Sequence, residues 1–535
     1  MTWQTMYPAT PGSPYTTLAS GIDDDDTSIS LTADPGFAAA TNLACIWDDT
    51  GAFEVVKYTD LTGTTLTVER AFEGTAQAWS AGAYIANLIP AYAINSLQNN
   101  VDILAAQFGI QSIIGIEWDS SSSSPELKRI DVNGDEIQKS TFNRAAFFDN
   151  YAIHGNMKRC TLTSAGVATF GDDAKGTGLT LTGDYVMVRI PKTYIKFEYS
   201  DPYWRWWISP TPATGFSLHP AFYQRGHSAS PVDQVYVGAY TAGANGGTTT
   251  TNGASNTLYA TSWSGLKLTS KSGVKNLTGS GSSGTMAQFE AAGATIGTGW
   301  GLTNFHTLNL LQMLFYIEYA SFDSQSKVGL GRTNASNSAA ALTGTYLNQV
   351  GEGAGTDIQS LLASNGTYGS TTNDYHSVVW RGIENPWGNI WQFVPGYNTT
   401  DTSHRILNRD GTGTIANVLT AGNYEEITDP IPINGTTNIS GTDAGAYCHG
   451  YVSALARDSG NILGPMFVPG ALSGASDTYL TDYLYSHQSG ISQTGVLLAG
   501  GGWYYGAKAG IGCRNSNNGP ANVHAFVGGR VEFLG

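Results

Sequence analysis

Residues 1–87 alternate short apolar runs with polar, turn-forming segments. Runs of about five residues that are rich in β-branched and aromatic side chains and are bounded by Gly, Asp or Asn are typical of strands. The pattern predicts a small all-β domain with strands at 27–32, 44–47, 54–58 and 65–70. The acidic run 23–26 falls in a turn, either as a solvated loop or as a calcium site, and we favour the solvated loop.

The segment 91–108 has a helical pattern in which the apolar positions recur at spacings of 3, 4, 3 and 4 residues. This is the a/d seam of a coiled coil, and it consists of Ile94, Leu97, Val101, Leu104 and Phe108. A seam of about two heptads is too short to be stable alone. It therefore either joins copies of the chain or packs on a neighbouring domain. We expect self-association through a helical linker at 88–112.

The region 113–535 is predicted to form one large domain. With its helices and strands, the whole chain is expected to be an α+β protein. Its strongest helix signal lies at 302–322, where one apolar stripe predicts a helix in the main core. That stripe consists of Leu308, Leu311, Phe315 and Tyr319. Residues 529–534 predict a terminal strand that closes a sheet. Residues 239–285 are rich in Gly, Thr, Ser and Asn without periodicity, and they predict a long surface insertion.

Composition narrows the class of protein. Charged residues make up 13% of the chain, and the formal net charge is -16. A surface of this sign repels phosphate backbones, which excludes nucleic acid as a partner. The four cysteines lie far apart and show no CxxC spacing, so we expect free thiols: Cys45, Cys160, Cys448 and Cys513.

The sequence contains no run of 18 apolar residues, so we expect no insertion into a membrane. Its first residues lack the basic and apolar regions of a signal peptide. A composition typical of extracellular proteins, combined with no export signal, fits a part of a virion that is released by lysis.

The usual signals of catalysis are missing from the sequence. There is no phosphate-binding GxxxxGK motif and no HExxH motif, and the nine histidines do not cluster at ligand spacing. No pattern pairs two carboxylates for glycoside hydrolysis, although such a pair can also assemble in space. We therefore expect no enzyme activity, no metal and no cofactor. The Trp-rich stretch 380–391 fits either a sugar site or a buried core, and we favour the core.

The last 40 residues separate into two kinds of position. Gly501, Trp503, Ala509, Pro520 and Arg530 belong to a set that is suited to turns and close packing. The intervening residues are chemically diverse, as in binding hot spots. They are Tyr504, Tyr505, Lys508, Cys513, Arg514, Ser516, His524 and Phe526. The same residues are also compatible with a Tyr-rich strand and loop that pack on the core.

The order of the scaffold residues resembles one family. The motif runs Gly500-Gly501-Gly502-Trp503, Gly506, Ala509-Gly510, Asn517-Asn518, Pro520, Asn522 and Val527-Gly528-Gly529-Arg530. It resembles the C-terminal signature of the C-type-lectin-fold variable proteins of diversity-generating retroelements and their relatives among phage tail proteins. These share a fold with the formylglycine-generating enzyme. That enzyme needs two nearby cysteines in its C-terminal region, where this chain has Cys513 alone.

The resemblance implies a C-type-lectin-like domain at 113–535 whose exposed C-terminal positions bind a receptor on the bacterial host, either a protein or a glycan. Carried over by position, this set is Tyr504, Tyr505, Lys508, Gly512, Cys513, Arg514, Ser516, His524 and Phe526. Residues 1–87 resemble the β-domain that begins many siphophage tail appendages, which implies attachment to other tail proteins. The resemblance also implies a homotrimer on the phage tail. A tail-associated polysaccharide depolymerase and a structural virion decoration are the alternatives.

Overall fold

The computed structural model describes residues 15–87, 113–140, 142–224, 228–254, 256–333, 340–344, 377–399, 404–409, 423–427, 447–457, 464–488 and 494–534. The chain divides into two compact units, Met1–Gln111 and Ser112–Gly535. The predicted helix at 91–108, with the proposed seam of Ile94, Leu97, Val101 and Leu104, lies outside the described residues.

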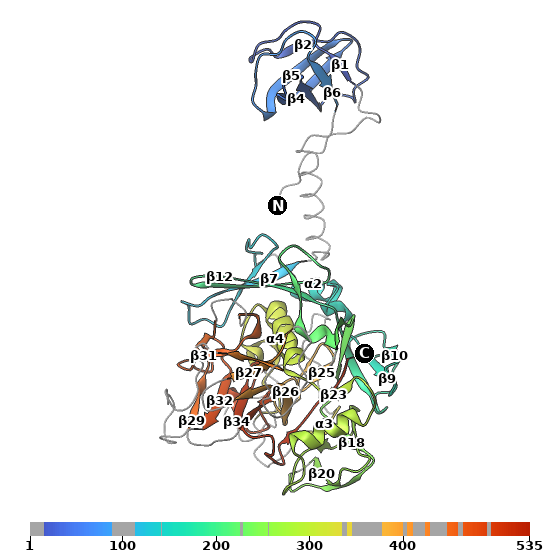
Figure 1. The fold of residues 1–535 in the computed structure, drawn as a ribbon, viewed down its shortest axis with the longest axis vertical. Helices are drawn as coiled ribbons and strands as arrows, with labels where there is room; N and C mark the ends of the chain where they lie inside the picture. The colour runs from blue at the N-terminus through green and yellow to red at the C-terminus, as the bar shows by residue number, and fades with distance from the viewer. Residues whose placement is uncertain are drawn as a thin grey trace. The chain divides into compact units, whose positions relative to one another are not determined.

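The N-terminal unit contains a six-stranded sheet in its described part, with the strand order β1-β6-β3-β4-β5-β2 (Figure 1). The strands are β1 (Tyr15–Thr17), β2 (Ser28–Ser30), β3 (Asn42–Trp47), β4 (Phe53–Thr62), β5 (Thr65–Gly74) and β6 (Tyr84–Ala86). Alternation along β3 and β4 buries Ala44, Ile46, Val56 and Tyr58 in one core. The four strands that the sequence predicts here are confirmed, and β4 and β5 extend further than expected.

A buried ion pair fixes the turns of this unit. Glu54 is fully buried and accepts hydrogen bonds from the guanidinium of Arg70 at 2.8 and 2.9 Å and from the Trp79 indole at 3.0 Å. Arg70 also donates to the backbone oxygens of Asp23 and Asp26. The acidic run 23–26 is therefore held by its backbone, while its side chains stay exposed.

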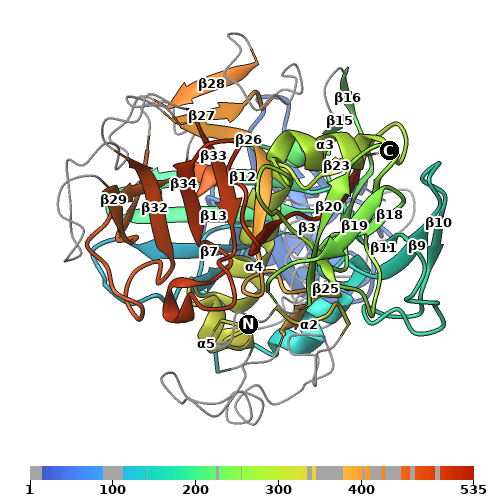
Figure 2. The same cartoon turned by 90° about the horizontal axis from the view of Figure 1, so that it is seen from below.

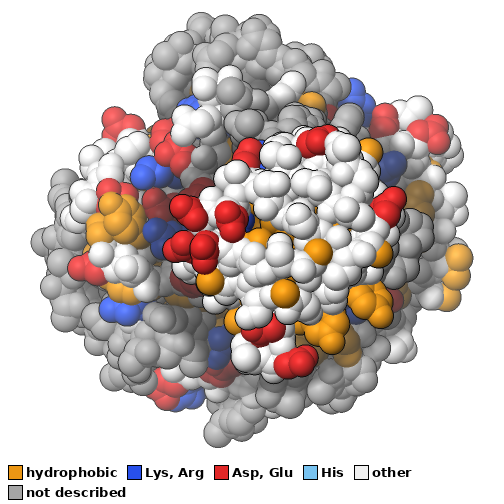
Figure 3. All heavy atoms as spheres, turned by 90° about the horizontal axis from the view of Figure 1, so that it is seen from above, with side chains coloured by type: hydrophobic (Ala, Val, Ile, Leu, Met, Phe, Trp, Pro, Cys, Tyr) orange, Lys and Arg blue, Asp and Glu red, His pale blue; other side chains and the backbone are white. Residues whose placement is uncertain are grey.

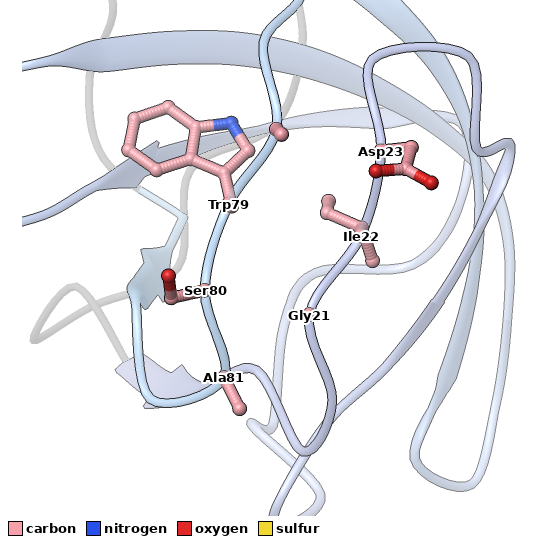
Figure 4. A pocket seen from close by; sticks show the side chains of 7 residues that line it. Gly21, Ile22, Asp23, Trp79, Ser80 and Ala81 are labelled. Atoms are coloured by element: carbon pink, nitrogen blue, oxygen red, sulfur yellow. The ribbon is translucent and has the colours of Figure 1, made fainter.

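A shallow pocket beside this turn lies between residues 21–23 and 78–81 (Figure 4). Its two walls are joined by reciprocal backbone hydrogen bonds of Ile22 and Trp79, at 2.9 and 2.8 Å. The side chains at its rim include Asp23 and Ser80. The pocket is thus an opening between paired turns.

The larger unit is β-rich and is built on three main sheets. One has the order β10 (Ala168–Phe170), β9 (Arg159–Leu162), β11 (Val186–Pro191), β17 (Gln234–Gly238), β36 (Val531–Leu534) and β23 (Trp300–Leu302). The second has the order β14 (Ser217–Leu218), β12 (Tyr194–Ser200), β13 (Tyr203–Ser209), β7 (Ile114–Asp119) and β8 (Lys128–Ile130). The predicted terminal strand is β36, and it lies between two partners instead of at the edge of its sheet.

The third sheet carries the C-terminal region. Its order is β28 (Tyr424–Ile427), β27 (His404–Leu407), β26 (Trp391–Thr399), β33 (Gly495–Ala499), β34 (Arg514–Asn518), β32 (Tyr483–Gln488) and β29 (Tyr447–Tyr451), with β35 (Val527–Gly528) beside β26. Figure 2 shows β29, β32, β34 and β33 side by side.

The larger unit also contains short strands, helices and 3-10 turns. The small strands are β15 (Tyr223–Gln224), β16 (Ser228–Pro231), β24 (Val379–Trp380), β25 (Ile383–Glu384), β30 (Ala454–Leu455) and β31 (Pro469–Ala471). The helices are α2 (Arg144–Asn150), α3 (Met286–Ala294), α4 (Phe305–Tyr319), α5 (Ser324–Val328) and the 3-10 turns η1 (His154–Asn156), η2 (Pro220–Phe222), η3 (Gly464–Met466) and η4 (Gly506–Lys508).

Helix α4 is the centre of the larger unit, as its apolar stripe predicts. All of its residues are buried, and it contacts β7 of one sheet and β26 of another (Figure 1). It begins at the cap residue Asn304, whose side chain accepts from the first-turn N–H groups of His306 and Thr307. A helix that is buried on every side requires partners for its polar side chains as well as its apolar ones.

Glu318 shows how α4 meets this requirement. Its carboxylate accepts from Arg381 at 2.5 and 3.0 Å, from Arg144 at 2.9 Å and from the Trp380 indole at 2.9 Å. Burial disfavours its charge, but the charge and hydrogen bonds of Arg381 lower the pKa of Glu318 to about 2. The Trp-rich stretch 380–391 is therefore core, as favoured from sequence, with Trp380, Trp387 and Trp391 fully buried.

Residues 239–285 are expected from the sequence to form a long surface insertion or loops, and the expectation of loops is wrong. This segment forms β18 (Gly243–Asn245), β19 (Thr248–Thr251), β20 (Thr257–Ser262), β21 (Lys267–Thr269) and β22 (Asn276–Leu277). Leu266, Leu268 and Leu277 from it are fully buried in a core that also contains Phe289 of α3. The buried leucines of this layer are isolated in the sequence, and glycines form the turns between its strands. Neither feature produces a periodic pattern of apolar residues. Figure 3 shows that backbone and side chains that are neither charged nor hydrophobic cover much of the described surface on one face of the protein.

Candidate functional site

The C-terminal segment 500–526 is anchored by Trp503. Its side chain is 3% exposed and packs with Ala254, Ala340 and Ile390. Gly500 and Gly501 precede it with φ values of +90° and +81°, a region that favours glycine. A Cβ atom on Gly501 would lie 2.8 Å from the Cβ of Ala509, which is closer than such atoms approach. The prediction that Trp503 is buried is confirmed.

Four aromatic side chains from the two ends of this segment meet over the anchor. The Tyr504 ring lies 4.7 Å from Tyr505 and 5.5 Å from Phe526, measured between centroids. Phe526 in turn stacks on His524 at 4.7 Å. Tyr504 is 49% exposed and His524 is exposed, while Tyr505 and Phe526 are half-buried. The segment therefore places these rings side by side at the surface.

The insertion at 239–285 supports the far end of the segment. Ala254 contributes to the packing around Trp503 and Phe526. The N–H of Gly279 donates to the carbonyl of His524 at 3.0 Å. The N–H of Met286, at the start of α3, donates to the carbonyl of Pro520 at 3.0 Å. The loop that carries His524 and Phe526 is thus attached by its backbone to the layer beneath it.

Two strands that the sequence reasoning missed extend the ring cluster. Tyr505 lies edge-to-face with Tyr485 of β32 at 5.9 Å. Tyr485 stacks on His449 of β29 at 6.0 Å with an interplanar angle of 5°. Tyr483 lies 4.7 Å from Tyr485 and 4.9 Å from Tyr451. The missed signal is the spacing of two residues between Tyr483 and Tyr485 and between His449 and Tyr451, which puts each pair of rings on one face of its strand.

We call this set the aromatic surface. It consists of His449, Tyr451, Tyr485, Tyr504, Tyr505, His524 and Phe526. Lys508 adjoins it, with its Nζ 4.7 Å from the ring centroid of the buried Tyr483. Burial raises the pKa of Tyr451 to about 12, and burial also raises the pKa of Tyr485 and of Tyr504. The phenols are therefore neutral near pH 7 and can donate as well as accept hydrogen bonds.

Three residues expected to be exposed are buried instead. Cys513, Arg514 and Ser516 have 0%, 2% and 0% exposure. Arg514 and Ser516 lie in β34, an interior strand between β32 and β33, and Cys513 directly precedes this strand in a hydrophobic core cluster. Their predicted place on the exposed receptor-binding face is therefore wrong, whereas Gly512 is partly exposed and donates its N–H to Asp482.

Arg514 turns inward toward α4. Its guanidinium donates to the Gln312 side chain at 2.9 Å and lies 5.5 Å from the Phe305 ring centroid. Burial lowers the pKa of Arg514. Burial also raises the pKa of the neighbouring Cys513 thiol well above its usual value, so this thiol is not a nucleophile near pH 7.

Within the described residues, no group of three His, Cys, Asp or Glu side chains is arranged to hold a metal ion. In the same part of the chain, no helix is long and apolar enough to cross a membrane. What the aromatic surface offers chemically is contact area, neutral hydroxyl groups and a nearby ammonium group.

No protein-family model matches the sequence, and no curated protein matches it. Three solved structures with a detectable likeness are the U1, I1 and P3c variants of the Major Tropism Determinant. Their identities are 12%, 13% and 12%, and their TM-scores are 0.25, 0.24 and 0.24. The alignments cover 78%, 91% and 93% of this chain and 84%, 93% and 95% of theirs. TM-scores of this size do not establish a common fold.

Proposed function

We propose that this chain is a receptor-binding protein of a phage tail, and that the aromatic surface contacts the host cell. One observation carries the proposal: surface rings from 447–451, 483–488 and 504–526 form one continuous cluster above a fully buried scaffold. Tyr and Phe give large contact area at small entropic cost, and rigid scaffolds that carry them are typical of recognition surfaces.

The scaffold and surface positions also agree with the motif that begins at Gly500. Trp503, Ala509 and Arg530 are buried, and Arg530 donates to four acceptors, on Gln392, Gly238, Glu384 and Asn385. Tyr504 and His524, between them, are exposed. This division supports the proposal of a C-type-lectin-like domain at 113–535 that displays changeable positions on an invariant support.

The N-terminal unit is proposed to attach the protein to other tail proteins. Trp47 stacks on Tyr84 at 5.5 Å, and Phe53 is paired with Trp47 across β3 and β4. Phe53 is 54% exposed. Trp47 and Tyr84 are partly exposed, and a row of aromatic side chains at the surface of neighbouring strands suits a contact with another protein. With this attachment, the proposed location is the virion tail, and the proposed assembly is a homotrimer through 88–112.

The proposal assigns no catalytic step, metal or cofactor to the chain. Its test is adsorption of a phage that encodes the chain. The purified full-length protein, added before the phage, should block adsorption, and the Tyr504→Ala variant should block it less well. Release of reducing ends from host polysaccharide would instead favour a depolymerase. Normal adsorption in the presence of saturating protein would favour a structural decoration.

A further inference from the structure

Lys508 is a cation placed against aromatic rings. Its Nζ lies 4.7 Å from the centroid of Tyr483 and 5.9 Å from that of Tyr485. Among the described residues, no carboxylate lies within ion-pair distance of it. In the same part of the chain, seven other lysines are paired with Asp or Glu: Lys57, Lys128, Lys139, Lys192, Lys196, Lys271 and Lys327. In a chain with net charge -16, an ammonium that is held by rings and left without a carboxylate is available to an anion from outside.

The rings beside Lys508 are held in place by each other. His449 accepts or donates a hydrogen bond at 2.6 Å between its Nδ1 and the hydroxyl of Tyr483. The same imidazole stacks on Tyr485, and Tyr451 meets Tyr483 edge-to-face. His449, Tyr451, Tyr485 and Lys508 are each partly exposed. The cluster therefore presents pre-positioned ring surfaces next to a single positive charge.

Amide groups continue the cluster along β34. Asn515 is the sheet partner of Tyr485. The Nδ2 of Asn518 donates to the side-chain oxygens of Asn515 and Asn517, and the Nδ2 of Asn522 donates to the Oδ1 of Asn518. Asn517, Asn518 and Asn522 are partly exposed. These hydrogen bonds between side-chain amides fix the orientation of polar groups that can bind the hydroxyl groups of a ligand.

We propose that Lys508, with Tyr485, Tyr451 and His449, forms a subsite for a sugar residue that carries a carboxylate or phosphate. A sugar ring offers one apolar C–H face to a tyrosine and hydroxyl groups to phenols and amides, and its acid group would pair with the Lys508 ammonium. The inference rests on the proposed function, and it names the ligand class for the same surface.

The exposure of the rings favours a saccharide over a protein. A stable protein interface buries about 800 Å² on each partner, around a strongly apolar centre. Here Tyr504 and His524 are the exposed rings, and Tyr451, Tyr485 and Tyr505 are half-buried against the hydrophobic core beneath them. Ring surfaces that are recessed in this way suit a small polar ligand.

The test uses full-length protein on an array of bacterial oligosaccharides that includes each acidic glycan together with its neutral counterpart. The expected result is binding to the acidic members that is at least about tenfold weaker for Lys508→Gln, a ratio equal to about 1.4 kcal/mol. Lys508→Arg keeps the positive charge and should bind within a few-fold of wild type. The matched control is Lys267→Gln, a partly exposed lysine of β21 outside the aromatic surface. Thermal unfolding verifies that each variant is folded.

Three results would overturn the inference: equal binding to neutral glycans, acidic binding that Lys508→Gln leaves unchanged, or no glycan binding at all. Binding of the full-length protein to host cells, measured in parallel, distinguishes a failure of the acidic-sugar subsite from a failure of the proposed function. If the protein binds cells and protease treatment of the cells abolishes that binding, the receptor is a protein and the proposed function stands. If the protein binds neither glycans nor cells, both fail. Loss of cell binding after periodate oxidation of the cells would support the saccharide.

Discussion

Tyr504 and Phe526 meet at 89° with their ring centroids 5.5 Å apart, although they come from opposite ends of the C-terminal segment. Both rings also contact Trp503, at 6.1 and 6.0 Å. One buried indole therefore supports two surface rings from distant positions. This arrangement separates the residues that hold the segment from those that face solvent.

Replacing Tyr504 by Ala should weaken binding to the host by about 1–3 kcal/mol, the range for an aromatic hot spot. Tyr504 is 49% exposed, so the free energy of unfolding should change little. The affinity for host cells and a urea unfolding curve measure the two effects. Tyr15→Ala is the matched control, because Tyr15 is 68% exposed in the N-terminal unit. Unchanged affinity in Tyr504→Ala would contradict the assignment of the surface.

Replacing Trp503 by Ala should lower the free energy of unfolding by about 3–5 kcal/mol, as for other large core aromatics. The indole fills the space between Ala254, Ala340 and Ile390 and supports the rings above it. Trp503→Phe keeps part of this volume and should cost less. Chemical unfolding followed by circular dichroism measures both. A fully stable Trp503→Ala protein would show that the segment is held by other contacts.

Arg514 should behave as a core residue. Arg514→Ala leaves the side-chain oxygen of Gln312 without its donor, which costs about 1–3 kcal/mol of stability. Arg514→Met also removes this donor, but it fills more of the space than alanine and removes a buried charge, so it should cost less than Arg514→Ala. Host binding by the folded Met variant should match wild type. A selective loss of binding in Arg514→Met, with unchanged stability, would place the guanidinium at the ligand after all.

Glu384 should make stability fall as the pH rises. Burial raises its pKa to about 7, against the opposing effect of the Gly344 N–H, whereas an unfolded glutamate has a pKa of about 4.3. A folded pKa above the unfolded value gives a stabilising contribution that is complete below about pH 4.3 and is lost as the pH rises through 7.

The Glu384→Gln variant lacks this titration. Its free energy of unfolding relative to wild type should therefore increase by about 1.4 kcal/mol for each pH unit between pH 5 and pH 7, and level off by pH 8. Urea titrations at four pH values between 5 and 8 measure the trend. Parallel curves for the two proteins would show that Glu384 does not titrate in this range.

Phe53→Asp should reduce incorporation of the protein into virions without unfolding the N-terminal unit. Phe53 is 54% exposed, and it is the cross-strand partner of Trp47 on the neighbouring strand. An aspartate there would bring an unpaired charge into the proposed contact with a tail protein. Phe170→Asp is the control, because Phe170 is 40% exposed in the larger unit. Immunoblots of purified particles measure incorporation, and equal amounts of both variants would contradict the attachment surface.

The sequence predicts those parts of the fold that have a periodic signal. The N-terminal strands alternate with a period of two, and α4 carries an apolar stripe at helical spacing, so both are recognised. The layer at 239–285 is not, because its buried leucines are scattered among glycine turns. Its role in supporting His524 depends on a backbone hydrogen bond from Gly279, which leaves no trace in side-chain pattern.

The candidate site was predicted in part for a similar reason. Tyr504 and His524 lie in turns, where diverse side chains are usually exposed, and they are exposed here. Arg514 and Ser516 have equally polar side chains, but they belong to an interior strand whose two neighbours are β32 and β33. Strand order within a sheet is set by contacts distant in sequence, so chemical type alone does not reveal which polar residues are covered.

The position of β36 also bears on how the larger unit folds. Val235 and Val237 of β17 pair with Leu534 and Glu532, and the other edge of β36 pairs with β23. Each of these pairings closes a loop of more than two hundred residues. Folding is slow in proteins of high contact order because the chain entropy lost in closing such loops precedes the gain from the contacts. We expect the edges of β17 and β23 that face β36 to remain unpaired until β36 inserts between them. Folding of this unit should therefore be slow and cooperative, with β36 joining late.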